Sequence, residues 1–398
     1  MAEIEQVEYT PAALAFPVEE GLVQACRESF GATLRAVVLT GSLARNEGSY
    51  IHRDGQAILQ SDVEAIVVLQ DEAPLPSRAA SHKLCELAKQ KLAARGVCVE
   101  VSFSVVHGSY LRHLPPHIYS YELRSCGVVL FGETTILELI PNYSASDVSL
   151  EDAWRMLSNR LIEQMEPIAD TPETAALKRY RSIKLCLDVA SSLLVFFGRF
   201  EAGYRARLLR MEEVALTPAA QLHLLPIPME KFLPLVRLCT LAKLEPEANA
   251  GPGEGFEKEV TDWAWKIWRW QLLRMTGCDA EFGAEKLLRV FSRRQGNKKL
   301  LRGWLYAVRR MGWLSSAIYW PKWFWLFASG LTPRHAIYLA AYRWREACCG
   351  KAVSDQKTGM KAVRELLPVK GAARVTSADR IATQVVWNYK EFTTETRS

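Results

Sequence analysis

Three acidic residues lie in short segments that have the composition of β-strands. Asp62 and Glu64 stand two positions apart at the start of the apolar segment 62–69, so their side chains should point to the same face of a strand. Glu100 lies within the alternating segment 97–106, where an unpaired buried carboxylate would be costly. Carboxylates that converge at one edge of a sheet are the oxygen ligands that Mg²⁺ prefers, with substrate phosphates and water as further ligands. The spacing therefore predicts a metal-assisted phosphoryl or nucleotidyl transfer.

A glycine–serine pair offers the other half of such a site. The apolar segment 34–40 is expected to be a strand, and Gly41 and Ser42 follow it at the start of a helix. A glycine lets the backbone approach phosphates that a Cβ would hold away, and backbone N–H groups and the Ser42 hydroxyl are donors to a triphosphate. Arg45, in the next turn, is predicted either to contact phosphate or to pair with Glu47 on the surface.

The segments around these residues predict a fold of mixed strands and helices. Apolar or alternating runs bounded by turn residues are expected to be strands, and apolar residues at helical spacing indicate a helix. The expected strands cover 34–40, 62–69, 97–106 and 128–131, with a helix over 81–95 and a hairpin whose turn is Asp54-Gly55. We predict an α+β protein, with an N-terminal mixed β-sheet domain flanked by helices over residues 1–145 and a large all-α region after it.

The rest of the chain has helical spacing of its apolar residues. Thr171-Pro172 is typical of a helix start, and EPEANAGPGEG at 245–255 is typical of a linker. We predict a helical domain over 146–248 and a basic, tryptophan-rich helical region over 249–350. A polar C-terminal tail over 351–398 is expected to follow, and its beginning is expected to be mobile.

Three motifs of the N-terminal domain resemble, in order and placement, the signature of the DNA polymerase β-like nucleotidyltransferase superfamily: Gly41-Ser42, Asp62-Val-Glu64 and Glu100. The segment 121–132 is also similar to the motif that closes the domain in many minimal and antibiotic-modifying members. The resemblance covers residues 30–135, about a third of the chain. One departure is the long spacing from Gly41 to Asp62, which contains the expected hairpin. That insertion is interpreted either as shaping acceptor choice or as drift away from activity.

The resemblance implies a Mg²⁺-dependent nucleotidyltransferase, in which an acceptor hydroxyl or amine attacks the α-phosphate of a nucleoside triphosphate and pyrophosphate leaves. Gly41 and Ser42 would hold the β- and γ-phosphates. Asp62 and Glu64 would bind two Mg²⁺ ions, with Mn²⁺ as an alternative metal, and Glu100 would be a third metal ligand or the general base. ATP is the expected nucleotide.

A lysine in the helical domain is a further candidate for the nucleotide site. Members of the superfamily with a helical second domain often use a lysine from one helix against the triphosphate. Lys184 is our candidate, and it lies on one helix stripe with Arg181 and Asp188. The alternative is an ordinary surface ion pair between Lys184 and Asp188. The domain over 146–248 would then complete the nucleotide cleft.

Charge is unevenly distributed over the 398 residues, whose net charge is +6. Residues 1–150 hold 11 lysines and arginines against 18 aspartates and glutamates, whereas residues 255–350 hold 17 against 7. The basic stretch also carries ten of the twelve tryptophans. Either the tryptophans fill a helical core and the basic residues lie on its solvated surface, or the region binds an acceptor or partner. Nucleic acid is one such partner, but it is not favoured because no RNA-binding module is recognisable.

The aromatic segment 319–327 (YWPKWFWLF) has two interpretations. It would either lie at a membrane surface, with tryptophans at headgroup depth, or pack against the helical region, which we favour. No window reaches the ~18 uninterrupted apolar residues of a membrane span, and the acidic N-terminus is unlike a signal peptide. The nine cysteines form no Cys-x-x-Cys pair. We therefore expect a cytoplasmic protein without a transmembrane segment.

The preferred function is transfer of a nucleotide to a small-molecule or sugar-like acceptor. One alternative is a polymerising or cyclising member that makes oligonucleotides. Another is a non-catalytic regulatory protein that keeps the fold and binds the nucleotide without turnover.

Overall fold

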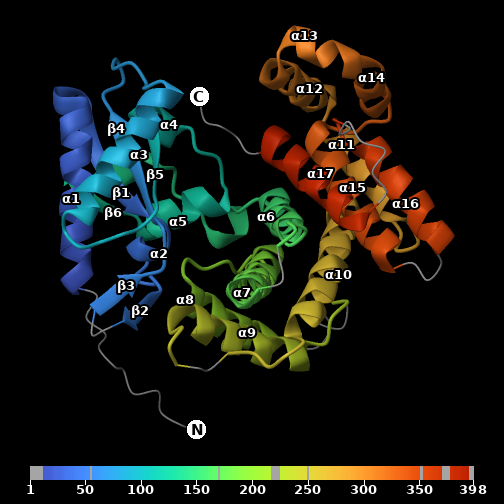
Figure 1. The fold of residues 1–398 in the computed structure, drawn as a ribbon, viewed down its shortest axis with the longest axis horizontal. Helices are drawn as coiled ribbons and strands as arrows, with labels where there is room; N and C mark the ends of the chain where they lie inside the picture. Colours follow the sequence, from blue (N-terminus) through green and yellow to red (C-terminus); the bar gives the residue numbers. More distant parts are fainter. Residues whose placement is uncertain are drawn as a thin grey trace.

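In the computed structural model of the chain, the described residues are 12–53, 56–168, 171–216, 225–248, 251–349, 353–369 and 377–393. A small mixed sheet and its helices form the N-terminal part, and helices form the rest (Figure 1). The predicted α+β fold class is confirmed.

Four strands form the sheet of the N-terminal part, in the order β5-β4-β1-β6. They are β1 (Leu34–Thr40), β4 (Val63–Leu69), β5 (Val101–His107) and β6 (Val128–Gly132). β1 is antiparallel to β4 and β6, and β4 is parallel to β5. All four predicted strands are present, but β5 begins at Val101, so Glu100 lies just before the strand.

Helices cover both faces of this sheet. They are α1 (Ala12–Phe30) and α3 (Arg78–Ala93) on one face, and α4 (Gly108–Arg112) and α5 (Ile118–Cys126) on the other. Val67 of β4 packs under the first pair, and Ile66 packs under the second. Because side chains alternate along a strand, burial of both faces requires an entirely apolar strand, which is the composition of β4 after Glu64.

A separate two-stranded hairpin follows the short helix α2 (Gly41–Ala44). β2 (Tyr50–Arg53) pairs antiparallel with β3 (Gln56–Leu59), as the sequence predicts. The predicted turn residues Asp54-Gly55 lie outside the described residues. At the base of the hairpin, the Gln60 N–H donates to the Ser49 carbonyl at 2.8 Å.

The helices beyond the sheet, in chain order, are α6 (Leu150–Glu163), α7 (Pro172–Phe196), α8 (Tyr204–Ala215), α9 (Met229–Leu244), α10 (Phe256–Thr276), α11 (Ala284–Arg294), α12 (Asn297–Met311), α13 (Trp313–Ser316), α14 (Trp320–Ala328), α15 (Pro333–Cys349), α16 (Val353–Leu366) and α17 (Ala378–Phe392). The predicted start of α7 is confirmed: Thr171 is its N-cap and accepts from the N–H of Thr174. None of the helices in the described ranges is long and apolar enough to span a bilayer.

One hydrophobic core joins these helices, and it extends across the boundary expected near residue 248. The fully buried Trp154 of α6 shows this best. Its ring lies 5.6 Å from that of Trp268, 5.4 Å from that of Phe291 and 5.3 Å from that of Tyr338, measured between centroids. Most tryptophans of the basic region therefore fill a core, as one of the two interpretations predicts.

The predicted polar tail after residue 350 was wrong for the described residues 353–369 and 377–393. They contain α16 and α17, which pack into the same core. Ile381, Val385 and Tyr389 stand at helical spacing along the buried face of α17. The opposite side of α17 is mostly polar, so the average composition of the segment hides this apolar face.

A chain that ends at residue 248 should fail to form its helical part, because Trp154 would lose Trp268, Phe291 and Tyr338 together. Far-ultraviolet circular dichroism during heating measures this, with the full chain as the control. We expect the truncated chain to lose the cooperative helical transition of the full chain. A sharp transition with the helix content of α6 to α9 would show that the shared core is dispensable.

Candidate active site

The register of the sheet brings the two N-terminal motifs together. Thr40 of β1 pairs with Glu64 of β4, so Gly41 stands directly beside the Glu64 side chain. Gly41 has a φ of +72°, and a Cβ at this position would lie 2.5 Å from Oε2 of Glu64. Any other residue at position 41 would be strained and would push the carboxylate away. Ser42 follows in α2, which packs against β4 at the same end of the sheet.

The two carboxylates lie in different surroundings. Glu64 is partly buried, whereas Asp62, just before β4, is exposed. Burial raises the pKa of Glu64, and the negative charge of Asp62 raises it further. The positive charges of Arg45 and Lys184 oppose this shift without cancelling it. The neighbouring positive charges therefore do not balance the negative charges of the two carboxylates. A bound divalent cation would balance them.

Lys184 of α7, in the helical part, lies close enough to Glu64 for its positive charge to lower the pKa of that carboxyl. Its Nζ lies 4.8 Å from the centroid of the Tyr180 ring. The alternative pairing with Asp188 is not present, because Asp188 pairs with Arg160 at 2.6 Å. Within the described ranges, Lys184 makes no ion pair with a carboxylate at contact distance. Its ammonium group therefore remains available to an anion.

A second lysine, Lys243 of α9, lies 5.6 Å from the centroid of the same Tyr180 ring. It is buried, and its Nζ donates to Oγ of Ser49 at 2.6 Å, while Ser49 Oγ donates to the Lys243 carbonyl at 2.7 Å. Ser49 also donates its N–H to Oγ of Ser61 at 2.9 Å, next to Asp62 in the chain. This chain of contacts joins the β2–β3 hairpin, α9 and the carboxylate motif.

Arg45 is largely buried where the sheet domain meets the helices. Its guanidinium contacts the carboxylates of Glu47 and Glu122, each at 3.3 Å, and lies over the Tyr204 ring. Pairing with Glu47 is the alternative that the sequence offered, although the pair is buried and not on the surface. A contact between Arg45 and phosphate remains a prediction.

Arg207 of α8 completes this polar network from the helical side by donating to Glu122 of α5. Burial lowers the pKa of Arg207 to about 9, and the positive charge of Arg45 lowers it further, while the negative charge of Glu47 opposes the shift. Glu47 accepts the N–H of Arg205 at 3.0 Å, in the first turn of α8. These contacts fix the helical part against the sheet domain.

Glu100 is not placed with the other two carboxylates. Its side chain is 82% exposed and pairs with Lys89 of α3 at 2.6 Å. Its carbonyl accepts the N–H of Val63 at 2.8 Å, so the backbone is beside Asp62 although the side chain turns away. In the part of the chain that the structure describes, no three His, Cys, Asp or Glu side chains gather to hold a metal ion. The predicted cluster of three carboxylates is therefore not formed in this structure, because Glu100 is drawn to Lys89.

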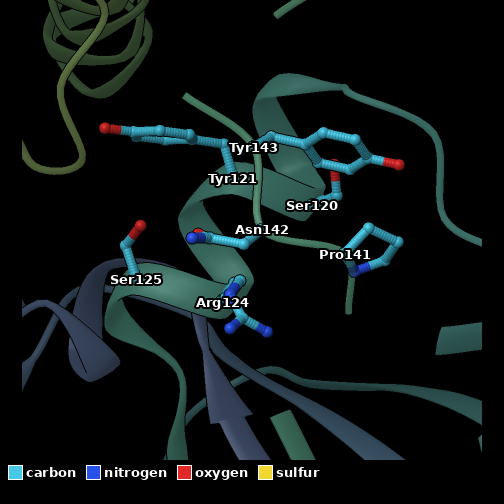
Figure 2. Close-up of a pocket in the computed structure, with 7 residues that line it drawn as sticks. All are labelled: Ser120, Tyr121, Arg124, Ser125, Pro141, Asn142 and Tyr143. Carbon is cyan, nitrogen blue, oxygen red and sulfur yellow. The ribbon is translucent and has the colours of Figure 1, made fainter. Parts of the chain in front are cut away.

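A hollow of about 240 Å³ lies between α5 and the segment 141–143 (Figure 2). Its lining residues are Ser120, Tyr121, Arg124, Ser125, Pro141, Asn142 and Tyr143. Arg124 is its one charged residue, and its guanidinium donates to the carbonyls of Leu137 and Glu138, each at 3.2 Å. Nη1 of Arg124 is therefore engaged by the backbone, and the lining of the hollow contains none of the predicted site residues. We therefore keep the candidate site at Asp62 and Glu64.

Lys243 and Ser49 were not identified from the sequence. No motif contains them, and 194 residues separate them in the chain. The one indication is that Lys243 continues a buried stripe of α9 that also carries Phe232, Val236 and Cys239. A lysine on a buried helix face requires a partner or a function, because its charge is costly to bury.

Comparison with known proteins adds little to this geometry. No family model matches the sequence, and no curated protein matches it. Among solved structures, the chain is similar to the spectinomycin adenyltransferase AAD(9) from Enterococcus faecialis, in a structure with ATP and spectinomycin. The two share 13% identity at a TM-score of 0.36, over 63% of this chain and 98% of that one. A likeness at this level carries no argument about the present chain.

We expect Glu64→Gln to stabilise the protein at neutral pH. The folded chain holds the Glu64 proton more tightly than the unfolded chain, so the ionised carboxylate costs stability above the folded pKa. That cost disappears below the unperturbed pKa of about 4.3. The melting temperature of the variant should exceed that of the wild type by roughly 1–3 °C at pH 7 and equal it near pH 4.

Glu259→Gln, at an exposed position of α10, is the matched control and should have no such effect. If Glu64→Gln lowered the melting temperature at pH 7, the Glu64 carboxylate would instead be a stabilising structural group.

Proposed function

We propose that this chain is a nucleotidyltransferase. It would transfer a nucleoside monophosphate from a nucleoside triphosphate, expected to be ATP, to a hydroxyl or amine of a small-molecule acceptor. The observation that carries the proposal is the Asp62 and Glu64 carboxylate pair, packed against the Gly41 turn and faced by the unpaired Lys184. Carboxylates beside a free cation fit a metal-bound triphosphate better than they fit a purely structural role.

The donor set fits one Mg²⁺ ion. Mg²⁺ is commonly bound through one or two carboxylates, with substrate phosphates and water as its other ligands. Asp62 and Glu64 would hold it, and when bound it would neutralise charge on the phosphates. The second predicted Mg²⁺ ion would require Glu100 as a further ligand. The contact of Glu100 with Lys89 is an exposed ion pair that solvent screens, so it opposes that movement only weakly. Mn²⁺ stays an alternative to Mg²⁺.

The side chains on the helical side suit the triphosphate. Lys184 would bind the β- and γ-phosphates, together with Ser42 and the Gly41 backbone. Tyr180 positions Lys184 by cation–π contact, and Lys243 adds positive charge beside the same ring. The acceptor would approach from the exposed side of Asp62, where Glu100 is the candidate general base because its backbone is adjacent in the sheet.

A second function has one observation in its favour. Because Glu100 pairs with Lys89, the present arrangement would bind a nucleotide without the base that turnover needs. A nucleotide-binding regulatory protein would bind Mg²⁺–ATP and release no pyrophosphate with any acceptor. Pyrophosphate release in the presence of a metabolite extract separates the two functions.

Asp62→Asn should abolish this pyrophosphate release, because the variant loses one of two charged metal ligands. We expect a loss of roughly 100-fold or more, with no decrease in the melting temperature of the protein, because the substitution removes a charge that repels Glu64. Asp279→Asn, on the surface beyond α10, is the control for the same chemical change. Wild-type release by Asp62→Asn would overturn the assignment of the carboxylate pair.

Lys184→Gln should weaken binding of Mg²⁺–ATP about tenfold, as expected for the loss of one charge-assisted contact to phosphate. Isothermal titration calorimetry measures this directly, whether or not an acceptor is known. Lys258→Gln, at an exposed position of α10, removes the same charge away from the site and should bind normally. Equal affinities of the two variants would mean that Lys184 does not contact the nucleotide.

A further inference from the structure

Helices α12, α13 and α14 form one end of the molecule, drawn in orange at the upper right of Figure 1. α13, the turn Ala317–Tyr319 and α14 follow one another directly. Their inner face is buried through Ser316, Trp323 and Leu326. The Trp323 indole also donates to the Pro368 carbonyl at 2.9 Å. The packing interpretation of segment 319–327 is therefore confirmed for this inner face.

The outer face of the same segment is also apolar. Leu314 is 87% exposed, Ile318 76%, Phe324 71% and Trp313 64%. Trp320 and Trp325 are exposed beside them, and we call these six residues the apolar tip. Helical segments that are apolar on both the inner and the outer face are ordinarily covered on both. An exposed aromatic and aliphatic patch of this kind marks an interaction surface.

The charged residues near the apolar tip in the sequence are all basic. No acidic residue occurs between Glu285 and Glu346, and residues 297–328 contain six lysines and arginines. Three of them, Lys298, Arg302 and Arg309, are exposed on α12 and form no ion pair with any described residue. Neighbouring helices neutralise two others: Glu151 of α6 pairs with Lys299, and Glu391 of α17 pairs with Arg310. The exposed leucines Leu301 and Leu305 lie among these cations on α12.

We propose that this end of the molecule docks on the surface of an anionic lipid bilayer. The apolar tip would enter the boundary between headgroups and acyl chains, where tryptophan is favoured, and the three free cations of α12 would contact lipid phosphates. No helix needs to span the bilayer for this mode of binding. The inference goes beyond the proposed transfer reaction and does not depend on it.

A second copy of the chain fits this surface less well. A two-fold interface would place the same patch on both sides, so the cations Lys298, Arg302 and Arg309 would meet a surface that is also basic and, among the described residues, carries no acidic partner for them. A nucleic acid would satisfy the cations and could stack its bases on the aromatic residues of the tip, but it would leave Leu314 and Ile318, the two most exposed residues of the tip, without an apolar partner. A bilayer satisfies both the charge and the aliphatic groups.

The experiment is vesicle co-sedimentation of the full chain. One set of vesicles is pure phosphatidylcholine, and the other contains phosphatidylglycerol as the anionic lipid. We expect strong binding only to the anionic vesicles. Lys298→Gln/Arg302→Gln/Arg309→Gln should lower the partition coefficient roughly 100-fold, and Leu314→Ser/Phe324→Ser should also remove binding. Both variants should keep the wild-type melting temperature, because all the substituted side chains are exposed.

Leu75→Ser/Leu209→Ser is the matched control, since it removes two exposed leucines from other surfaces. It should bind vesicles as the wild type does. Equal, weak sedimentation of the wild type and every variant would overturn the proposal. So would a dimer in analytical ultracentrifugation that Leu314→Ser/Phe324→Ser dissociates, or single-stranded RNA binding that the triple substitution abolishes while vesicle binding stays absent.

Discussion

The contact between the Gly41 backbone and the Glu64 carboxylate fixes the candidate site. It follows from one register, in which Thr40 opposes Glu64 across antiparallel strands. A shift of that register by a single residue would turn Glu64 to the other face of the sheet, toward α1 and α3. The close approach tolerates only a glycine with a positive φ. The arrangement of carboxylates, turn and approaching lysine therefore depends on this pair of strands.

The helical part is oriented by charged groups at its contact with the sheet domain. Arg207 meets Glu122, Arg45 meets both Glu47 and Glu122, and Glu47 caps the first turn of α8. Buried ion pairs often contribute little net stability, but their geometry permits few arrangements of the two surfaces. Fixing α8 in this way also fixes α7 beside it, which carries Lys184 toward the carboxylates. Precise orientation is what a site divided between two parts of a chain requires.

The sequence was most informative where the physical cause is local. Strand alternation, the Thr171-Pro172 helix start and the aligned acidic residues all depend on near neighbours, and the structure contains each of these elements. Lys184 was proposed from the family resemblance and its place on a helix stripe, and its role at the nucleotide stays a prediction. The direction of the Glu100 side chain could not be predicted in this way, because it depends on Lys89 of a different helix. The two helices near the C-terminus were missed because their apolar faces become evident only against the core that they cover.

Two hydrogen bonds between Ser49 and Lys243 fix the base of the inserted hairpin to α9. Movement of β2 and β3 away from α9 would break these two hydrogen bonds. It would also leave the buried ammonium group of Lys243 without a hydrogen-bond acceptor. The base of the hairpin is therefore held to α9, and the hairpin is not free to move as a flap.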